Sequence, residues 1–181
     1  MIKDSIVRKI TAPNPGVLTG DGTNSYLVGV NDITLVDPGP AISEHIDNLI
    51  NLGGNKLNRI FVTHTHNDHS PAAKIIADKL KIPVYGNYAK FSNYQDTSFK
   101  PDFSFDDEME FDFEDSNIVA IHTPGHASNH FCFYIKQSGC LITGDHIMLK
   151  IIQNTIYIRT NYFAFGKRPL KNSITCNFCH P

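Results

Sequence analysis

The chain has 181 residues, of which 41% are hydrophobic and 19% are charged, and its formal net charge is −2. This length suits one domain with a hydrophobic core, and the composition excludes a disordered or fibrous chain. Because no apolar run could cross a membrane and the N-terminus lacks the apolar stretch of a secretion signal, we expect a cytoplasmic protein that contacts no membrane.

The charges are unevenly distributed along the chain. Residues 1–149 carry 11 Lys and Arg against 18 Asp and Glu, a net charge of −7, whereas residues 150–181 carry five basic residues and no acidic ones. This shift predicts a domain over 1–149 and an atypical tail over 150–181. The acidic part offers no basic groove for phosphates, so we expect a small-molecule substrate rather than a nucleic acid.

Strands and two helices alternate along the first part of the domain. Turn signals separate predicted strands at 5–10, 25–30 and 33–36. A helix is predicted with Ser43 as its cap and the Gly53-Gly54 pair as its end, and with His45 on its exposed face. A strand over 59–62 then leads through a loop to a helix over 71–80, for which we expect Ser70 to be the cap and Pro71 the first residue.

Strands dominate the second part of the domain. After a short strand at 84–85 and a loop over 87–100, alternating Phe and acidic residues predict a half-buried strand or hairpin over 102–113. Three further strands are predicted at 118–122, 131–135 and 140–143. These elements indicate an α/β sandwich whose polar loops gather at one edge of a sheet.

The most informative stretch is His64-Thr65-His66-Asn67-Asp68-His69, between the predicted strand and helix. Imidazole is the commonest metal ligand, and a His-x-His pair leaving a strand directs two imidazoles the same way. Four potential ligands within six residues indicate one or two transition metal ions, zinc first among them.

Two later strand ends supply further candidate ligands. His64, His66 and His126 could give three nitrogens to one zinc, Asp68 and His69 could begin a second site, and Asp145 could bridge the two. Asp68 is also the candidate catalytic residue, because its carboxylate could orient a metal-bound hydroxide.

Other polar residues near these positions have different expected roles. Asp37 is expected to hydrogen-bond the ligand loops rather than to bind metal, and His130 to pack beside the site. The alternation of side chains along a strand should turn His122 and His146 away from the metals.

These residues resemble the motifs of the metallo-β-lactamase superfamily. Its hallmark His-x-His-x-Asp-His is similar to residues 64–69, and further motifs match Asp37-Pro38-Gly39, Thr123-Pro124-Gly125-His126 and Gly144-Asp145. Residues 14–16, 22–28 and 123–130 most resemble the branch that contains β-lactamase-like protein 2 and the hydroxyacylglutathione hydrolases. The resemblance implies a four-layer αββα sandwich with His64, His66 and His126 on the first metal, Asp68 and His69 on the second, and Asp145 between them.

The resemblance ends after about Met148, and the family's last His ligand has no counterpart in residues 150–181. We interpret the chain as C-terminally truncated or frame-shifted there, with an incomplete sandwich and a weak second metal site. His146 and His180 are the conceivable substitutes for the last ligand.

Four functions remain open on the sequence alone. The first is a zinc hydrolase that uses metal-bound hydroxide on a thioester or other small ester. The others are a metal-dependent ribonuclease of the same fold, a persulfide dioxygenase with iron at His64, His126 and Asp145, and an inactive remnant. The oligomeric state cannot be derived from the sequence.

Overall fold

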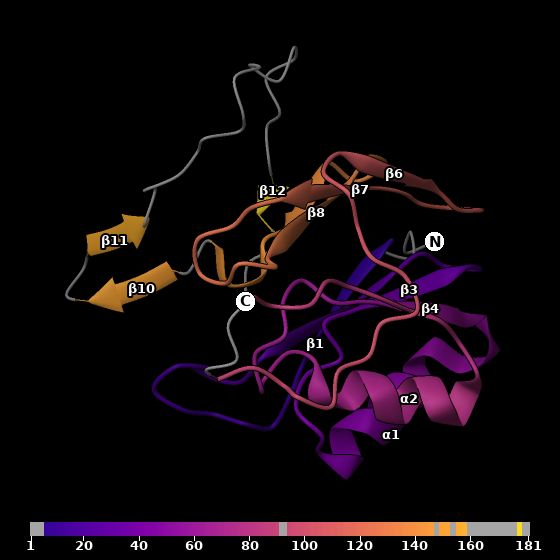
Figure 1. The fold of residues 1–181 in the computed structure, drawn as a ribbon, viewed down its shortest axis with the longest axis horizontal. Coiled ribbons are helices and arrows are strands. Elements are labelled where there is room, and N and C mark those ends of the chain that lie inside the picture. Colours follow the sequence, from indigo (N-terminus) through magenta and orange to yellow (C-terminus); the bar gives the residue numbers. More distant parts are fainter. Residues whose placement is uncertain (1–5, 91–93, 147–148, 153–154, 159–176, 179–181) are drawn as a thin grey trace, which may run out of the picture.

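The computed structural model describes residues 6–90, 94–146, 149–152, 155–158 and 177–178, with side-chain detail up to residue 146. Two five-stranded sheets pack face to face, and two helices cover the outer face of the first (Figure 1). Within the described part of the chain, no helix is long and apolar enough to span a bilayer.

The first sheet has mixed strand directions. Its strands follow chain order, with β1 and β2 antiparallel, β2 and β3 antiparallel, and β4 parallel to both β3 and β5. The strands are β1 (Val7–Thr11), β2 (Asn24–Val28), β3 (Ile33–Val36), β4 (Leu57–Phe61) and β5 (Val84–Tyr85). Strand β3 is an unbroken apolar run except for one Thr, as expected for a strand that is buried on both faces.

The helices α1 (Ser43–Gly53) and α2 (Pro71–Leu80) make the parallel connections possible, because each links one strand of the first sheet to the next. Their apolar side chains bury one core against the sheet, formed by Ile46, Leu49 and Ile76 with Leu35 and Ile60 of the strands. Ser43, the predicted cap, is instead the first residue of α1, because the extended residue before the helix is Ile42. A short 3₁₀ turn, η1 (Gly54–Lys56), follows α1.

The second sheet has the order β12-β9-β8-β7-β6. The strands β6 (Met109–Asp112), β7 (Asn117–His122), β8 (Phe131–Ile135) and β9 (Cys140–Ile142) are antiparallel, and β12 (Asn177–Phe178) pairs in parallel with β9. Strands β10 (Leu149–Ile152) and β11 (Thr155–Ile158) pair antiparallel in a separate two-stranded sheet.

The two sheets enclose a second core that is rich in aromatic rings. Phe61 lies at its centre, and its ring centroid is 4.8–6.2 Å from the rings of Tyr85, Phe105, Phe111, Phe113 and Phe133. This core holds the ends of β4, β7 and β9 in fixed relative positions, and the candidate ligands follow these three ends.

The α/β sandwich is confirmed, and in the described residues it has three of the expected four layers: helices, first sheet and second sheet. Most predicted strands lie within two residues of the observed ones. The strand or hairpin expected over 102–113 was too long, because only residues 109–112 form a strand. The tail is described only at β10, β11 and β12, so the domain boundary at residue 149 stays a prediction.

Candidate metal centre

The loop over residues 62–70 connects β4 to α2 and carries four of the candidate ligands. Its backbone folds back tightly, since the N–H groups of His69 and Ser70 both donate to the carbonyl oxygen of His66. His64 and His69 are buried, with 1% and 5% of their surface exposed.

The start of α2 differs in one respect from the prediction. Ser70 and Pro71 occupy the expected cap and first helical positions, but Ser70 makes no side-chain capping hydrogen bond. Its hydroxyl instead donates to Asp96 Oδ2 at 2.9 Å, because the buried loop packs against the segment that contains Asp96. The hydroxyl therefore joins two loops rather than stabilising the helix end.

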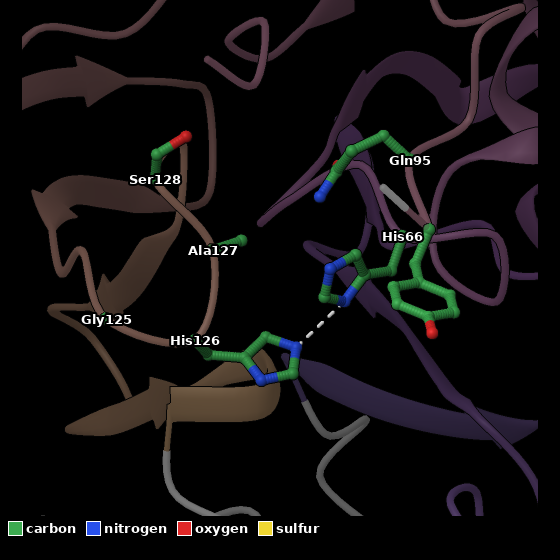
Figure 2. Close-up of a pocket in the computed structure, with 7 residues that line it drawn as sticks. His66, Gln95, Gly125, His126, Ala127 and Ser128 are labelled. Atoms are coloured by element: carbon green, nitrogen blue, oxygen red, sulfur yellow. Dashed lines mark hydrogen bonds between the residues drawn. The ribbon is translucent and has the colours of Figure 1, made fainter. Parts of the chain in front are cut away.

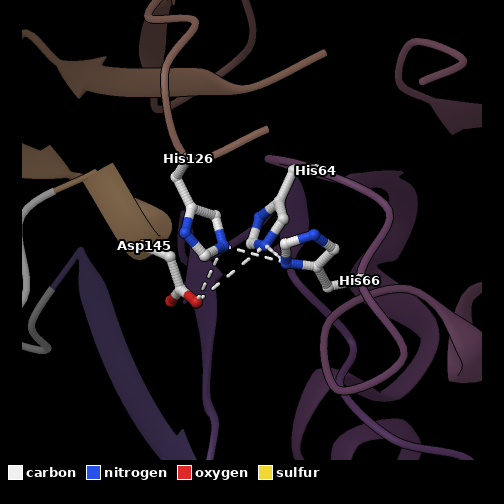
Figure 3. Close-up of side chains that lie close together, drawn as sticks. All are labelled: His64, His66, His126 and Asp145. Atoms are coloured by element: carbon white, nitrogen blue, oxygen red, sulfur yellow. Dashed lines mark hydrogen bonds and ion pairs between the residues drawn. The ribbon is translucent and has the colours of Figure 1, made fainter. Parts of the chain in front are cut away.

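Four side chains from three chain segments converge in a first cluster: His64, His66, His126 and Asp145 (Figure 3). His66 Nδ1 lies 3.0 Å from His64 Nε2 and 2.8 Å from His126 Nε2. Asp145 Oδ2 lies 3.3 Å from His126 Nε2 and 4.0 Å from His64 Nε2.

A second cluster shares one member with the first. It consists of Asp68, His69 and Asp145, with His69 Nε2 3.5 Å from Asp68 Oδ2 and 3.3 Å from Asp145 Oδ1. The two oxygens of Asp145 thus face different clusters, which is the placement that a bridging carboxylate would need.

The donor atoms of the first cluster suit a zinc ion. Four ligands about 2.1 Å from a tetrahedral zinc lie about 3.4 Å from one another. The distances of 2.8–4.0 Å bracket this value, and each cluster's donor atoms lie within 4.8 Å of one another. Burial is the largest cause that lowers the pKa of His64, His66 and His126, so these imidazoles keep the neutral form that binds metal.

Electrostatics differ in the second cluster. Burial would lower the pKa of His69, but Asp37 and Asp145 raise it well above its ordinary value. Burial would likewise raise the pKa of Asp145, whereas the hydrogen bond and the charge of His69 lower it to about 2. The charges of Asp37 and Asp145 therefore favour the protonated form of His69.

Asp37 orients ligands of both clusters, as the sequence predicted. It is 1% exposed and accepts hydrogen bonds from Thr63 N and Thr63 Oγ1, each at 2.7 Å, and from His69 Nδ1 at 2.9 Å. Because the only hydroxyl proton of Thr63 is donated to Asp37, Thr63 Oγ1 must accept from His64 Nδ1, 3.0 Å away. His64 Nε2 is then left to face the first cluster with its lone pair.

Gly144 brings Asp145 close to this loop. Its φ is +47°, and a Cβ built on it would lie 2.7 Å from His130 Nε2 and 2.8 Å from Thr63 Oγ1. A glycine is therefore required at this approach.

The remaining histidines stand outside both clusters. His130 is buried against His64, with ring centroids 5.0 Å apart, and its Nδ1 hydrogen-bonds Thr123 Oγ1. His122 is exposed, and the His146 ring lies 5.8 Å from that of His130. These positions agree with the expected roles, whereas His180 lies outside the described residues.

The expectation for His45 was wrong. This residue is only 2% exposed, and its Nε2 lies 3.1 Å from Ser25 Oγ. His45 shares a helix face with Leu49, four residues later, and this row faces the sheet. The ring hydrogen-bonds Ser25 on β2 and the backbone of Pro38, so its polar atoms are satisfied without contact with water.

A cavity of about 520 Å³ opens beside the first cluster (Figure 2). His66 and His126 form its inner wall, and the rest of the lining is Tyr94, Gln95, Gly125, Ala127 and Ser128. Sequence reasoning missed Gln95 and also Thr23, whose hydroxyl donates to Asp68 Oδ2 at 3.2 Å. Both come close to the cluster only through the tertiary fold, so neither carries a local signal.

Sequence comparisons show relatives over most of the chain. A β-lactamase-like protein 2 homologue of Caenorhabditis elegans is 32% identical over 156 residues, covering 81% of this chain and 51% of the relative. An atrochrysone carboxyl ACP thioesterase of Aspergillus chevalieri is 32% identical over 152 residues, 78% of this chain and 46% of the relative. The chain spans about half the length of the curated relatives it matches.

Structural comparisons support the same fold. A metallo-β-lactamase family protein of Thermus thermophilus has a TM-score of 0.65 at 19% identity, over 81% of this chain and 61% of that one. A subclass B3 metallo-β-lactamase of Bradyrhizobium japonicum has a TM-score of 0.55 at 18% identity, over 64% and 51%.

A model of the metallo-β-lactamase superfamily matches residues 18–171. This range holds both clusters and covers most of the chain. By fold and by sequence, the chain therefore belongs to the metallo-β-lactamase superfamily.

Proposed function

We propose that the chain is a zinc-dependent hydrolase that acts on a thioester or another small ester. The observation that carries the proposal is the pair of clusters that share Asp145, one with three neutral imidazoles and one with a carboxylate and an imidazole. Bound there, one or two zinc ions would polarise the substrate carbonyl and supply hydroxide near neutral pH.

The chain's own side chains have distinct parts in this proposal. His64, His66 and His126 hold the cation with neutral nitrogens, and Asp145 offers one oxygen to each cluster. Asp68, whose side chain is 33% exposed, would orient the attacking hydroxide by accepting its hydrogen bond, and the Thr23 hydroxyl donates to Asp68 Oδ2.

The choice of substrate rests on the relatives and on charge. Two of them are named atrochrysone carboxyl ACP thioesterases, which favours a thioester for this chain. The described residues that line the cavity include no Lys or Arg that could hold a phosphate backbone, which argues against the ribonuclease alternative.

An iron dioxygenase is the second candidate. His64, His126 and Asp145 present two imidazoles and a carboxylate, a set that suits non-haem iron. The identity of the metal separates the two functions.

The test combines metal analysis of the purified protein with an assay of thioester hydrolysis, in which the released thiol is measured. We expect zinc and hydrolysis in the wild type, and loss of both in His64→Ala. The control is His122→Ala, an exposed histidine outside both clusters, which should retain metal and activity. Stoichiometric iron without hydrolysis would favour the dioxygenase, and a metal-free, inactive protein would contradict both candidates.

A further inference from the structure

The cavity beside the first cluster presents a fixed hydrogen-bond donor. We propose that the side-chain amide of Gln95 binds an uncharged carbonyl oxygen on an arm of the substrate, and so selects substrates that carry such a group. This inference rests on the proposed hydrolase function and adds a specificity residue to it.

Backbone contacts place Gln95 next to the metal ligands. Gln95 forms an antiparallel bridge with His66, and Asp96 N donates to the carbonyl oxygen of Thr65 at 2.7 Å. The segment from residue 94 to residue 96 is therefore attached to the ligand loop, and Gln95 keeps its place when the loop does.

A chain of hydrogen bonds fixes the direction of the amide, starting from a backbone carbonyl. Asn129 Nδ2 donates to the carbonyl oxygen of Asn87 at 2.7 Å, which identifies that atom as the nitrogen. The same nitrogen donates to Thr65 Oγ1 at 2.9 Å. Thr65 is 3% exposed and Asn129 is 4% exposed, so water does not compete with these bonds.

The Thr65 hydroxyl has one proton, and it accepts from Asn129. That proton is therefore donated to Gln95 Oε1, the remaining contact of the hydroxyl. With its oxygen held in this way, the Gln95 amide must turn its nitrogen toward the cavity. Figure 2 shows this nitrogen directed into the space between Ala127 and His66.

The chemistry of the lining restricts the group that Gln95 can bind. An amide nitrogen only donates, so its partner is an oxygen acceptor. Among the described residues that line the cavity there is no Lys or Arg, so a carboxylate or phosphate at the Gln95 amide would have no cationic side chain from this lining beside it. A ketone or amide carbonyl fits these conditions better than a carboxylate or phosphate.

The test compares two pairs of thioesters, which differ by an amide in the first pair and by a ketone carbonyl in the second. On the thiol side, the acetyl thioester of N-acetylcysteamine is matched in length with that of pentanethiol. On the acyl side, the acetoacetyl and butyryl thioesters of propanethiol form the second pair. We expect the wild type to prefer the carbonyl-bearing member of at least one pair in kcat/KM.

Two variants should remove that preference. Gln95→Met deletes the donor, and the loss of one hydrogen bond predicts a preference reduced by about 2- to 12-fold. Gln95→Glu keeps the acceptor for Thr65 but turns an oxygen toward the substrate carbonyl, so the reduction should be larger. Gln137→Met, on the turn between β8 and β9, is the matched control and should keep the preference.

Thr65 provides a test of the positioning chain. Thr65→Val removes the hydroxyl that holds the amide and should reduce the preference without removing the metal, whereas Thr65→Ser should restore it. If Thr65→Val keeps the wild-type preference, the amide is not oriented by this contact and the inference is wrong.

A binding experiment separates this inference from the proposed function. N-acetyl-S-methylcysteamine is a thioether that cannot be hydrolysed, and saturation-transfer NMR measures its binding directly. Binding that depends on Gln95 in a protein without hydrolytic activity would support the subsite and contradict the hydrolase. Hydrolysis with no preference, or with a preference unchanged in both Gln95 variants, would contradict the subsite alone. A protein that shows neither hydrolysis nor binding would contradict both the subsite and the proposed hydrolase function.

Discussion

Asp37 shows how much a single buried carboxylate can organise. Asp37 belongs to neither cluster, yet it accepts hydrogen bonds from His69 and from Thr63, which in turn accepts one from His64. One side chain thus sets the ring orientation of a ligand in each cluster. Partners of this kind commonly change metal affinity by 10- to 100-fold when they are removed.

Asp37→Asn should therefore weaken zinc binding at both clusters by about 10- to 100-fold. The asparagine amide replaces one acceptor with a donor. An NH₂ group in place of Oδ2 opposes both the N–H of His69 and the hydroxyl of Thr63, and one in place of Oδ1 opposes the backbone N–H of Thr63. Competition with a chelating dye measures the affinity. The control is Asp102→Asn, which removes another carboxylate that accepts a backbone N–H, from Val84, away from the clusters. Equal zinc affinities in Asp37→Asn and the wild type would contradict the role of Asp37.

At this scale the sequence predicted the residues whose chemistry is local. The spacing from His64 to His69 indicates a ligand loop without any knowledge of the fold, and the structure brings those ligands together with His126 and Asp145. The role of Gln95 could not be predicted, because its orientation depends on Asn129, 34 positions later in the chain.

Among the elements, the parallel pair β3 and β4 is held at its start by a charged pair. Arg59 Nη2 lies 2.6 Å from Asp32 Oδ1, and Asn58 Nδ2 donates to the same oxygen. The Arg59 guanidinium also stacks 3.6 Å from the centroid of the Phe113 ring. The pair therefore joins the first sheet to a residue beside the second.

Asp32→Asn should lower the free energy of unfolding by about 1 kcal/mol at pH 7. Burial would raise the pKa of Asp32, but hydrogen bonds from Asn58 and Arg59 and the charge of Arg59 lower it overall. The stabilisation is thus complete above the unfolded-state pKa of about 3.9 and disappears as the pH falls through the lower folded-state value.

Urea unfolding of the metal-free protein at several pH values checks this prediction. The difference between wild type and Asp32→Asn should shrink below about pH 4. Asp47→Asn breaks an ion pair whose side chains are 61% and 56% exposed, and it should change stability little at any pH. A difference that grows in acid would contradict the predicted sign.

Predictions for the elements succeeded where apolar periodicity and turn residues agreed. Helix α1 ends at Gly53 beside Gly54, whose φ is +57°, as the glycine pair indicated. The prediction of a strand over 102–113 was too long. In a strand Phe103 and Phe105 would lie on the same face, but Phe103 is 53% exposed whereas Phe105 is buried in the core between the sheets. An alternation of Phe with acidic residues does not distinguish a strand from a loop in which one Phe is buried in the core and another is exposed.

For the molecule as a whole, the decisive contact is the aromatic core between the sheets. Phe61 is fully buried at its centre, three residues before His64, the first candidate metal ligand. Phe61→Ala should cost about 3–5 kcal/mol of stability, because it leaves a cavity where five rings meet.

Thermal or urea unfolding measures this cost. Phe103→Ala removes a half-exposed ring at the edge of the same region, so it should reduce stability much less than Phe61→Ala does. Zinc affinity should also fall in Phe61→Ala, since β4 and the sheet opposite it would no longer be fixed to each other. Wild-type stability in Phe61→Ala would contradict this view of the core.

The order of the motifs predicted the sandwich, because each motif follows a strand that the fold must bring to the same edge. The sequence did not predict how the tail is arranged, since its composition carries no periodic pattern. Only the backbone of β10, β11 and β12 is described there.

The first cluster takes two imidazoles from a loop of one sheet and an imidazole and a carboxylate from loops of the other. Each layer therefore supplies only half of the first cluster. A cation at this point would cross-link the two sheets, which otherwise pack against each other mainly through apolar side chains. Unfolding by heat or denaturant would separate the sheets and release the cation. Metal occupancy and the stability of the packed sheets would thus be thermodynamically linked, so that a change in one changes the other.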